Sequence, residues 1–155
     1  MIDSETYRSA LGRWGTGVSV ITASDGRGRL GALTANSFTS VSLAPPLVLF
    51  CLAYDATSFE VFERASGFAV HVLTAGQERL SNHFAAKGGD KFVGIDHQPG
   101  LHGAPLLADC LMRLQCRLHE KIPAGDHLIL LGEVEAVEER EGAPLLFYHG
   151  KYHTL

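Results

Sequence analysis

The segment LTANSFTSVSLAPPLVLF, residues 33–50, combines two different kinds of sequence. Its second half is an apolar run after two prolines, which is typical of a buried strand. Its first half crowds hydroxyl and amide side chains among small and apolar residues, without the alternation of a half-buried strand. These polar residues are Thr34, Asn36, Ser37, Thr39, Ser40 and Ser42. What they bond decides how the segment is interpreted, because Ser and Thr beside strands often bond their own backbone.

The composition of the whole chain favours one domain, spanning residues 1–155, with one core. Apolar residues make up 46% and charged residues 19%, which argues against a long disordered tail. The net charge is −4 and no basic run is present, so nucleic acid is not an expected partner. The N-terminus lacks a signal-peptide pattern, and no apolar run approaches the ~20 residues of a membrane span. We therefore expect a soluble, cytoplasmic protein with no membrane partner.

The cysteines and histidines predict no metal site and no disulfide framework. The three cysteines, Cys51, Cys110 and Cys116, are odd in number and form no CxxC motif. We expect Cys110 and Cys116 to share one strand, where six residues separate them by ~20 Å, too far for a disulfide. The closest histidine pairs each enclose a glycine and lie outside any helical pattern, so no metal is expected.

Hydrophobic periodicity predicts six or seven strands and two or three short helices. The strands are expected at 18–23, from 30 onward, at 46–53 (buried on both faces), 67–73, 112–119 and 127–139, and near the C-terminus. A first helix is expected from Asp3 or Ser4 to about Trp14. Thr57 with Glu60, and Thr74 with Gln77, match capping boxes that begin two more helices. Residues 87–104 form a long Gly-rich loop, and loops of this length are usually functional or mobile.

This order of elements indicates a mainly β fold with short helices, most simply an antiparallel β-barrel with helices at its edges. The alternation of strands and helices of a dinucleotide-binding fold is absent, and so is its GxGxxG fingerprint.

A second polar feature supports a ligand-binding interpretation of the first. Thr57 and Ser58 stand at a predicted helix start, where free N–H groups and the positive end of the helix dipole suit a phosphate. Together with the polar segment 34–42 they would suit a phosphorylated cofactor. Plain helix capping by Thr57 remains the alternative.

Four segments carry a family resemblance over roughly residues 5–155. They are YRSALGRWGTGVSVITA, LTANSFTSVSLAPPLVLFCL, SFEVFERASGFAVHVL and AGDHLILLGEVEAV. In this order and spacing the chain resembles the short-chain flavin reductases, the NAD(P)H-dependent partners of two-component flavin monooxygenases. The resemblance implies a split β-barrel of the FMN-binding type, a homodimer with flavin near the subunit interface, and hydride transfer from NADH or NADPH to FMN or FAD. It also implies transfer of the reduced flavin to a monooxygenase.

The resemblance also implies roles for individual residues. His127, in the GDH motif, would contact the nicotinamide or the reduced flavin, with a plain turn residue as the alternative. Asp126 would hold the turn or the imidazole. The expected cofactor-binding residues are Thr34, Ala35, Asn36, Ser37, Ser40, Val41, Ala53, Thr57, Ser58, Phe84, Lys91, His149 and Tyr152. Among these, Phe84 would act as an aromatic lid and Lys91 as a cation for the phosphates, or Lys91 would be a solvent-exposed side chain.

Two other functions remain open at this stage, because one fold hosts many functions. The first is a non-reductase protein of the same barrel class that binds flavin or haem. The second is an enzyme that uses a bound flavin directly on an organic substrate.

Overall fold

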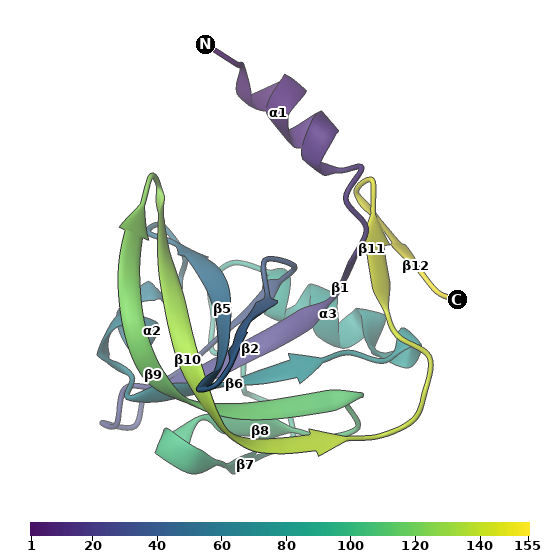
Figure 1. The fold of residues 1–155 in the computed structure, drawn as a ribbon. Coiled ribbons are helices and arrows are strands. Elements are labelled where there is room, and N and C mark those ends of the chain that lie inside the picture. Colours follow the sequence, from purple (N-terminus) through teal and green to yellow (C-terminus); the bar gives the residue numbers. More distant parts are fainter.

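The computed structural model describes residues 1–155, in which two of the three α-helices pack against a strongly curved antiparallel sheet (Figure 1). The helices are α1 (Ser4–Leu11), α2 (Phe59–Arg64) and α3 (Glu78–Ala85), with 3-10 turns at Ala75–Gln77 and Leu101–Gly103. The first strands are β1 (Thr16–Gly17), β2 (Ser19–Ser24), β3 (Leu30–Ala35), β4 (Thr39–Leu43), β5 (Pro46–Ala53) and β6 (Gly67–Val72). The later strands are β7 (His97–Pro99), β8 (Pro105–Leu107), β9 (Met112–Ala124), β10 (His127–Glu139), β11 (Leu146–Tyr148) and β12 (Lys151–His153).

The main sheet has seven strands in the order β3-β2-β6-β9-β10-β5-β4. Every pair of neighbours in it is antiparallel, which confirms the mainly β, antiparallel prediction. Strands β3 and β4 are consecutive in the chain, yet they occupy opposite ends of the sheet and are not paired with each other. The sheet is therefore open along β3, and β3 is an edge strand.

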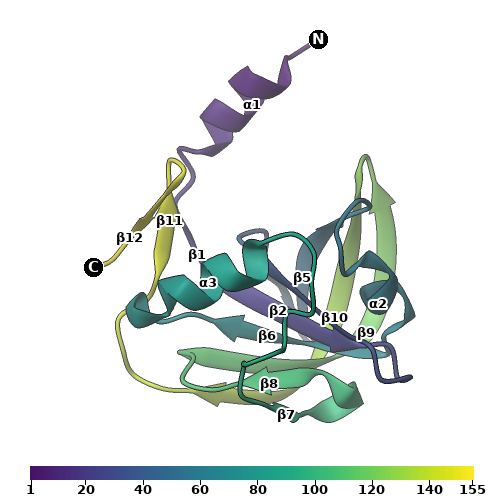
Figure 2. The ribbon, with the colours of Figure 1, turned by 180° about the vertical axis from the view of Figure 1, so that it is seen from behind.

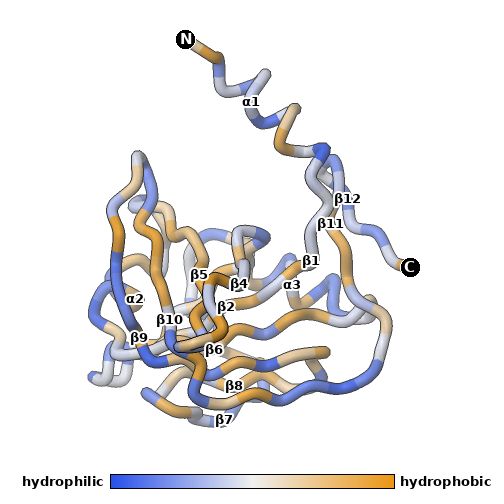
Figure 3. Tube along the Cα trace, in the orientation of Figure 1, coloured by the Kyte–Doolittle hydropathy of each residue, from blue (hydrophilic) through white to orange (hydrophobic).

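Two hydrophobic clusters fill the body, one on each face of the sheet. The larger packs α2 against the strands through Phe50, Phe62 and Phe68, with the rings of Phe50 and Phe68 edge to face at 4.9 Å. The smaller lies under α3, which crosses the other face (Figure 2). The hydrophobic stretches of the chain accordingly follow β2, β5, β6 and β10 through the body (Figure 3).

The prediction that β5 is buried on both faces is wrong. Val48, Phe50 and Leu52 are buried, whereas the alternate residues Leu49 and Cys51 are only half-buried. Strand β5 therefore has two apolar faces. One face packs in the core, and the other faces outward.

The two predicted capping boxes have different outcomes. Thr74 and Gln77 form the reciprocal pair, in which the Thr74 N–H donates to Gln77 Oε1 at 3.0 Å. The Thr57 box is wrong, because α2 begins after Ser58 and has no side-chain cap. The Ser58 hydroxyl instead bonds the Ala32 N–H at 3.1 Å and the Ala32 carbonyl at 3.0 Å. The Ser58 hydroxyl is thus bonded to the free edge of β3 and does not cap α2.

The N- and C-terminal segments form an arm that projects from the body (Figure 1). Strand β11 pairs with both β1 and β12, and the His149 N–H donates to the Gly12 carbonyl at 2.8 Å. Asp3 caps α1, as expected, but the helix ends at Leu11 and buries none of its residues. The apolar residues Tyr7, Leu11 and Trp14 are all exposed.

The segment 87–104 contains more structure than predicted. It includes β7 and a 3-10 turn, and β7 pairs with β8. Thr22 on β2 donates to the Pro105 carbonyl at 2.6 Å and fixes β8 to the sheet. Cys110 precedes β9 and does not share a strand with Cys116; all three cysteines are free. None of the helices has the length and hydropathy needed to cross a membrane.

A buried histidine predicts how stability depends on pH. His71 donates from Nδ1 to the Val20 carbonyl and accepts at Nε2 from the Leu107 N–H, both at 3.0 Å. Burial lowers the pKa of His71 from 6.5 to about 4. Between these values the unfolded chain binds a proton that the folded protein does not, so stability present above pH 6.5 is lost as the pH falls toward 4. The expected loss at this residue is about 3 kcal/mol, measured by urea denaturation at each pH.

A His71→Leu variant serves as the control for this prediction. It should be less stable at pH 7, because the Val20 carbonyl and the Leu107 N–H lose their partner. Its stability should also vary less between pH 6.5 and 4 than that of the wild type. An unchanged pH dependence would show that another group is responsible.

Candidate functional site

The exposed edge of β3 is the structural basis of the candidate site. In the pairing with β2, Ala32 lies opposite Thr22 and Thr34 lies opposite Val20. The main-chain groups of Ala32 point away from β2, since Ser58 bonds both of them. In an antiparallel ladder this orientation repeats every second residue, so the N–H and C=O of Thr34 also point toward the free edge. Leu30, Ala32 and Thr34 share one face of the strand.

Some polar side chains of the segment 34–42 form hydrogen bonds within the protein, whereas others are exposed to solvent. The Thr34 hydroxyl donates to the Ser81 carbonyl at 2.6 Å, and the Ser37 hydroxyl accepts the Cys51 N–H at 3.0 Å. For these two side chains the backbone-bonding alternative therefore holds. The Asn36 side chain is exposed. Ser40 and Val41 are exposed on β4, at the opposite end of the sheet.

Two adjoining cavities lie at the C-terminal end of β3. One, of about 210 Å³, is lined by residues that include Thr34, Ser81 and Tyr152. The other, of about 230 Å³, is lined by residues that include Thr16 and Phe38. Both cavities share Val18, Ala35 and Asn36 in their walls. Ala35, Asn36, Thr34 and Tyr152, which were predicted separately, are thus brought together.

The polar groups of this double cavity are of two kinds. Tyr152 is fixed, because its hydroxyl lies 2.6 Å from Ser81 Oγ and donates to Asn82 Oδ1 at 3.0 Å. Thr16 Oγ1, in contrast, is buried and has no hydrogen-bond partner. A buried polar atom without a partner is destabilising, so this wall suits a polar ligand that supplies one.

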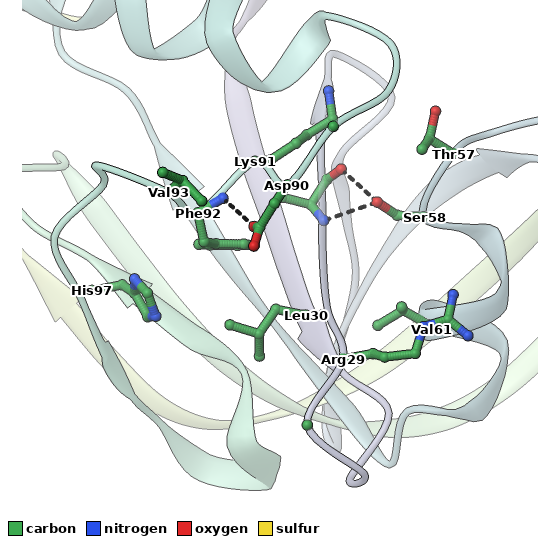
Figure 4. Close-up of a pocket in the computed structure, with 13 residues that line it drawn as sticks. Arg29, Leu30, Thr57, Ser58, Val61, Asp90, Lys91, Phe92, Val93 and His97 are labelled. Atoms are coloured by element: carbon green, nitrogen blue, oxygen red, sulfur yellow. Dashed lines mark hydrogen bonds between the residues drawn. The ribbon is translucent and has the colours of Figure 1, made fainter.

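A larger cavity of about 530 Å³ lies at the N-terminal end of β3 (Figure 4). Its walls include three predicted residues, Thr57, Ser58 and Lys91. The half-buried Lys91 ammonium donates to the Phe84 carbonyl at 3.4 Å, and burial lowers the pKa of this lysine. Since Phe84 is in the last turn of α3, the lysine helps to cap that helix while it lines the cavity.

His127 lies at the start of β10, directly opposite Ala53 on β5. Its Nδ1 lies 2.6 Å from Asp126 Oδ1, and this hydrogen bond holds the pKa of Asp126 below its usual range. His127 lines none of the cavities at β3. Two residues along β10, Ile129 lies opposite Cys51, whose N–H donates to Ser37 Oγ at 3.0 Å.

Two predicted residues lie away from the cavities. Phe84 is 2% exposed and packs on Phe92 in the core, with ring centroids 5.4 Å apart, which contradicts the expected lid. A large apolar ring on the inner face of α3 is used for packing. His149 is exposed in the β11–β12 turn at φ 52°, on the arm.

Sequence reasoning missed Thr16, Arg29, Ser81 and His97, which also line the three cavities. Ser81 carried a signal, since it is a polar residue on the apolar face of α3 beside Leu80 and Phe84. His97 lies in the long loop 87–104, which was predicted to be functional or mobile and in which only Lys91 was named as a cofactor-binding residue. Thr16 and Arg29 had no local signal, because their positions depend on the folding of the arm and of the β2–β3 turn.

Comparison with known proteins identifies the family of this chain. Residues 11–155 match the family model described as "Flavin reductase like domain". A probable flavin reductase of Rhizobium meliloti (strain 1021) is 41% identical over 154 residues, 99% of this chain and 50% of that protein. This chain thus spans half the length of that relative. The reductase subunit HsaB of a flavin-dependent monooxygenase from Mycobacterium tuberculosis (strain CDC 1551 / Oshkosh) is 39% identical over 154 residues, 97% of this chain and 82% of that protein.

A solved structure agrees with this match. The NADH:FAD oxidoreductase SgcE6 of Streptomyces globisporus C-1027, in complex with NAD and FAD fragments, superposes with a TM-score of 0.89 and is 39% identical. The match covers 99% of this chain and 94% of that one. Because the sequence match and the fold agree over nearly the whole chain, it belongs to the flavin reductase-like domain family.

Proposed function

We propose that this chain is an NADH-dependent flavin reductase that reduces FMN or FAD and supplies the reduced flavin to a separate monooxygenase. The observation that carries the proposal is the double cavity at the end of β3, where the partnerless Thr16 hydroxyl and the exposed Asn36 amide adjoin the free edge of Thr34. The relatives named as an NADH:FAD oxidoreductase and as a monooxygenase reductase subunit support the donor and the recipient.

The residues present fit a flavin. A flavin ring carries carbonyl oxygens and nitrogens along one edge, and the Thr34 main chain, Asn36 and Thr16 offer donors and acceptors to such an edge. Val18, Ala35 and Phe38 provide apolar surface beside them. The remaining predicted residues of the polar segment are Ser37, Ser40 and Val41. We propose that they form the outer boundary of the flavin site.

When bound, the flavin supplies the ring that accepts the hydride, so the protein needs neither a nucleophile nor a general acid. The protein binds both cofactors and holds them in contact. Tyr152, fixed by Ser81 and Asn82, closes one side of the double cavity. Thr57, Ser58 and Ala53 are proposed as the phosphate side. We propose His127 as a nicotinamide contact, oriented by the carboxylate of Asp126.

A His127→Ala variant should slow hydride transfer while flavin affinity stays nearly unchanged. One lost hydrogen bond of ~1–3 kcal/mol corresponds to a fall of about five- to a hundredfold in kcat/KM for NADH. Stopped-flow reduction at saturating flavin, with a separate flavin titration, measures both quantities. His119→Ala, an exposed histidine on neighbouring β9, is the matched control. An unchanged reduction rate would leave His127 as a plain turn residue.

We further propose that residues 1–155 form a single domain that assembles as a homodimer of split β-barrels, in which a second copy completes the enclosure of the flavin. The outward face of β5 and β10 supports this assembly. Leu49 and Cys51 on β5 lie opposite Leu131 and Ile129 on β10, and all four are half-buried. The solvated face of an antiparallel sheet is normally polar, so an apolar row of this kind is expected to be covered.

One steady-state assay tests the proposed function. The purified protein should quench the fluorescence of added FMN or FAD on binding, and it should oxidise NADH only when flavin is present. Flavin binding without NADH or NADPH oxidation would indicate a non-reductase flavin protein. Oxidation that requires a further organic substrate would indicate a flavin enzyme acting on that substrate. No binding of either flavin below millimolar concentration would refute the proposal.

A further inference from the structure

We propose that Ser66 is an activated nucleophile that takes the acyl group from small, activated carboxylic esters. His102 is its general base, and Glu135 orients that base. Ser66 directly precedes β6, His102 lies in the second 3-10 turn, and Glu135 is on β10. These three residues, the Ser66 cluster, line none of the cavities at β3, so the activity is separate from the proposed flavin reduction.

The side chains of the Ser66 cluster form a continuous line of hydrogen bonds. Ser66 Oγ lies 3.3 Å from His102 Nδ1, and His102 Nε2 lies 2.6 Å from Glu135 Oε1. Because a carboxylate only accepts, Nε2 carries the proton of the neutral ring and donates it to Glu135. Nδ1 is then an acceptor that faces the Ser66 hydroxyl. An imidazole bonded to a hydroxyl on one side and to a carboxylate on the other is the arrangement that activates a serine.

Two irregularities of the backbone bring the base and the carboxylate into this line. His102 has a φ of 57°, in the left-handed region that residues other than glycine adopt uncommonly. Glu135 stands at a β-bulge, because β9 has no residue paired with it between the pairs made by Val134 and Ala136. A bulge re-aims the side chain that it carries, and bulges are over-represented beside active sites. Regular backbone at either position would not hold these side chains together.

Gly67 provides the space in which the imidazole lies. A Cβ atom at this position would be 2.7 Å from the His102 ring, so the ring rests directly on the backbone of β6. The Ser66 carbonyl accepts the Leu118 N–H at 2.9 Å, which fixes the backbone of the nucleophile beside the ring. The base is therefore held by β6 on one face and by side chains at both nitrogens, which is the preorganisation that catalysis requires.

A substrate can reach the nucleophile from solvent, and a cation lies on the same face of the sheet. Ser66 is exposed, whereas the side chain of His102 is only 23% exposed. Arg117 lies opposite Gly67, so its side chain is on the face that the His102 ring covers. Its ion pair with Glu133, at 2.7 Å, is partly exposed and therefore weak, so the guanidinium can turn toward the negative charge that develops on an ester oxygen.

The reaction balances with water as the only other reactant. The Ser66 oxygen bonds to the carbonyl carbon of the ester, and the bond from that carbon to the leaving oxygen breaks. The proton of the hydroxyl passes to His102 Nδ1 and from there to the leaving oxygen. Water then attacks the acyl-serine in the same way, which releases the carboxylic acid and restores the hydroxyl. Because the bond from Ser66 to His102 is long, the site suits esters with a good leaving group.

The test measures hydrolysis of p-nitrophenyl acetate by the full-length protein. Ser66→Ala and His102→Gln should each lower kcat/KM for the ester by about a hundredfold, and Glu135→Gln should lower it by about tenfold. Phenylmethanesulfonyl fluoride should label Ser66, as located by mass spectrometry of peptides, and the label should be absent from Ser66→Ala. NADH oxidation with added flavin should be the same in Ser66→Ala as in the wild type, because the Ser66 cluster lies outside the flavin site.

Two controls separate the Ser66 cluster from ordinary surface chemistry. Exposed histidines hydrolyse activated esters slowly without a serine, so His119→Ala measures that background. Ser9→Ala removes an exposed serine of α1. Both controls should stay within about twofold of the wild type. Hydrolysis that is unchanged in Ser66→Ala, or a label on any other residue, overturns the proposal. If His102→Gln does not fold, as urea denaturation would show, Ser66→Ala and the labelling still decide between these outcomes.

Discussion

Replacing Gly67 by alanine is expected to destabilise the protein by more than ~3 kcal/mol, a fall in Tm of about 6–12 °C. A Cβ atom at this position would collide with the Cys116 carbonyl oxygen and lie 2.7 Å from the His102 ring. The carbonyl cannot move away, because Cys116 is paired with Phe68 in the central β6–β9 ladder. His102 is also held, by a hydrogen bond between its Nε2 and Glu135 Oε1 at 2.6 Å. The strain would therefore be relieved only by separating two central strands.

Gly15→Ala is the matched control for this prediction. A Cβ at Gly15 would meet only the Tyr148 ring, at an ordinary distance of 3.8 Å, and the backbone there does not need positive φ. Urea denaturation should show a change within ~0.5 kcal/mol for this control. Similar stabilities of the two variants would mean that β6 and β9 can shift apart without loss of packing.

The sequence predicted the elements whose signal is local. The limits of β5 and β10 were predicted as observed, at 46–53 and 127–139, because apolar runs bounded by proline or a turn are visible in the chain itself. The tight contact at Gly67 was not predictable, since it depends on which residues of β9 lie opposite β6. The half-exposed face of β5 was missed for the same reason: an apolar run does not show which of its faces the protein covers.

The two capping boxes show why only part of the site could be predicted. Both boxes have a Thr followed by a Glu or Gln three residues later, yet only the box at Thr74 forms. At the other, Ser58 bonds Ala32, a residue 26 positions away, and no local pattern reveals that competition. Thr34 and Asn36 were found because their own segment is unusual in composition. His97 and Arg29 were not, because only the folded chain brings them together across one cavity.

Replacing Leu131 by aspartate should convert the proposed homodimer into a 16.7 kDa monomer and abolish most of the flavin reductase activity. Leu131 lies in the middle of the apolar row, beside Leu49, with Ile129 two residues along the strand. An unpaired carboxylate buried in such an interface costs ~4 kcal/mol or more, which raises the dimer Kd about a thousandfold. His127 lies on this same face of β10, so separation of the subunits would expose the proposed nicotinamide contact to water.

Val137→Asp is the control that isolates the interface. Val137 is an apolar residue on the same strand, but it is 61% exposed and lies beyond the row. Light scattering across a dilution series should give a dimer for the wild type and for this control, and a monomer for Leu131→Asp. NADH oxidation is measured on the same samples, so that assembly and activity can be compared directly. A monomer that still binds flavin but reduces it slowly would indicate that the second copy contributes to the nicotinamide side of the site. A wild type that is monomeric at every dilution would contradict the assembly, and a fully active Leu131→Asp monomer would show that one chain encloses its flavin alone.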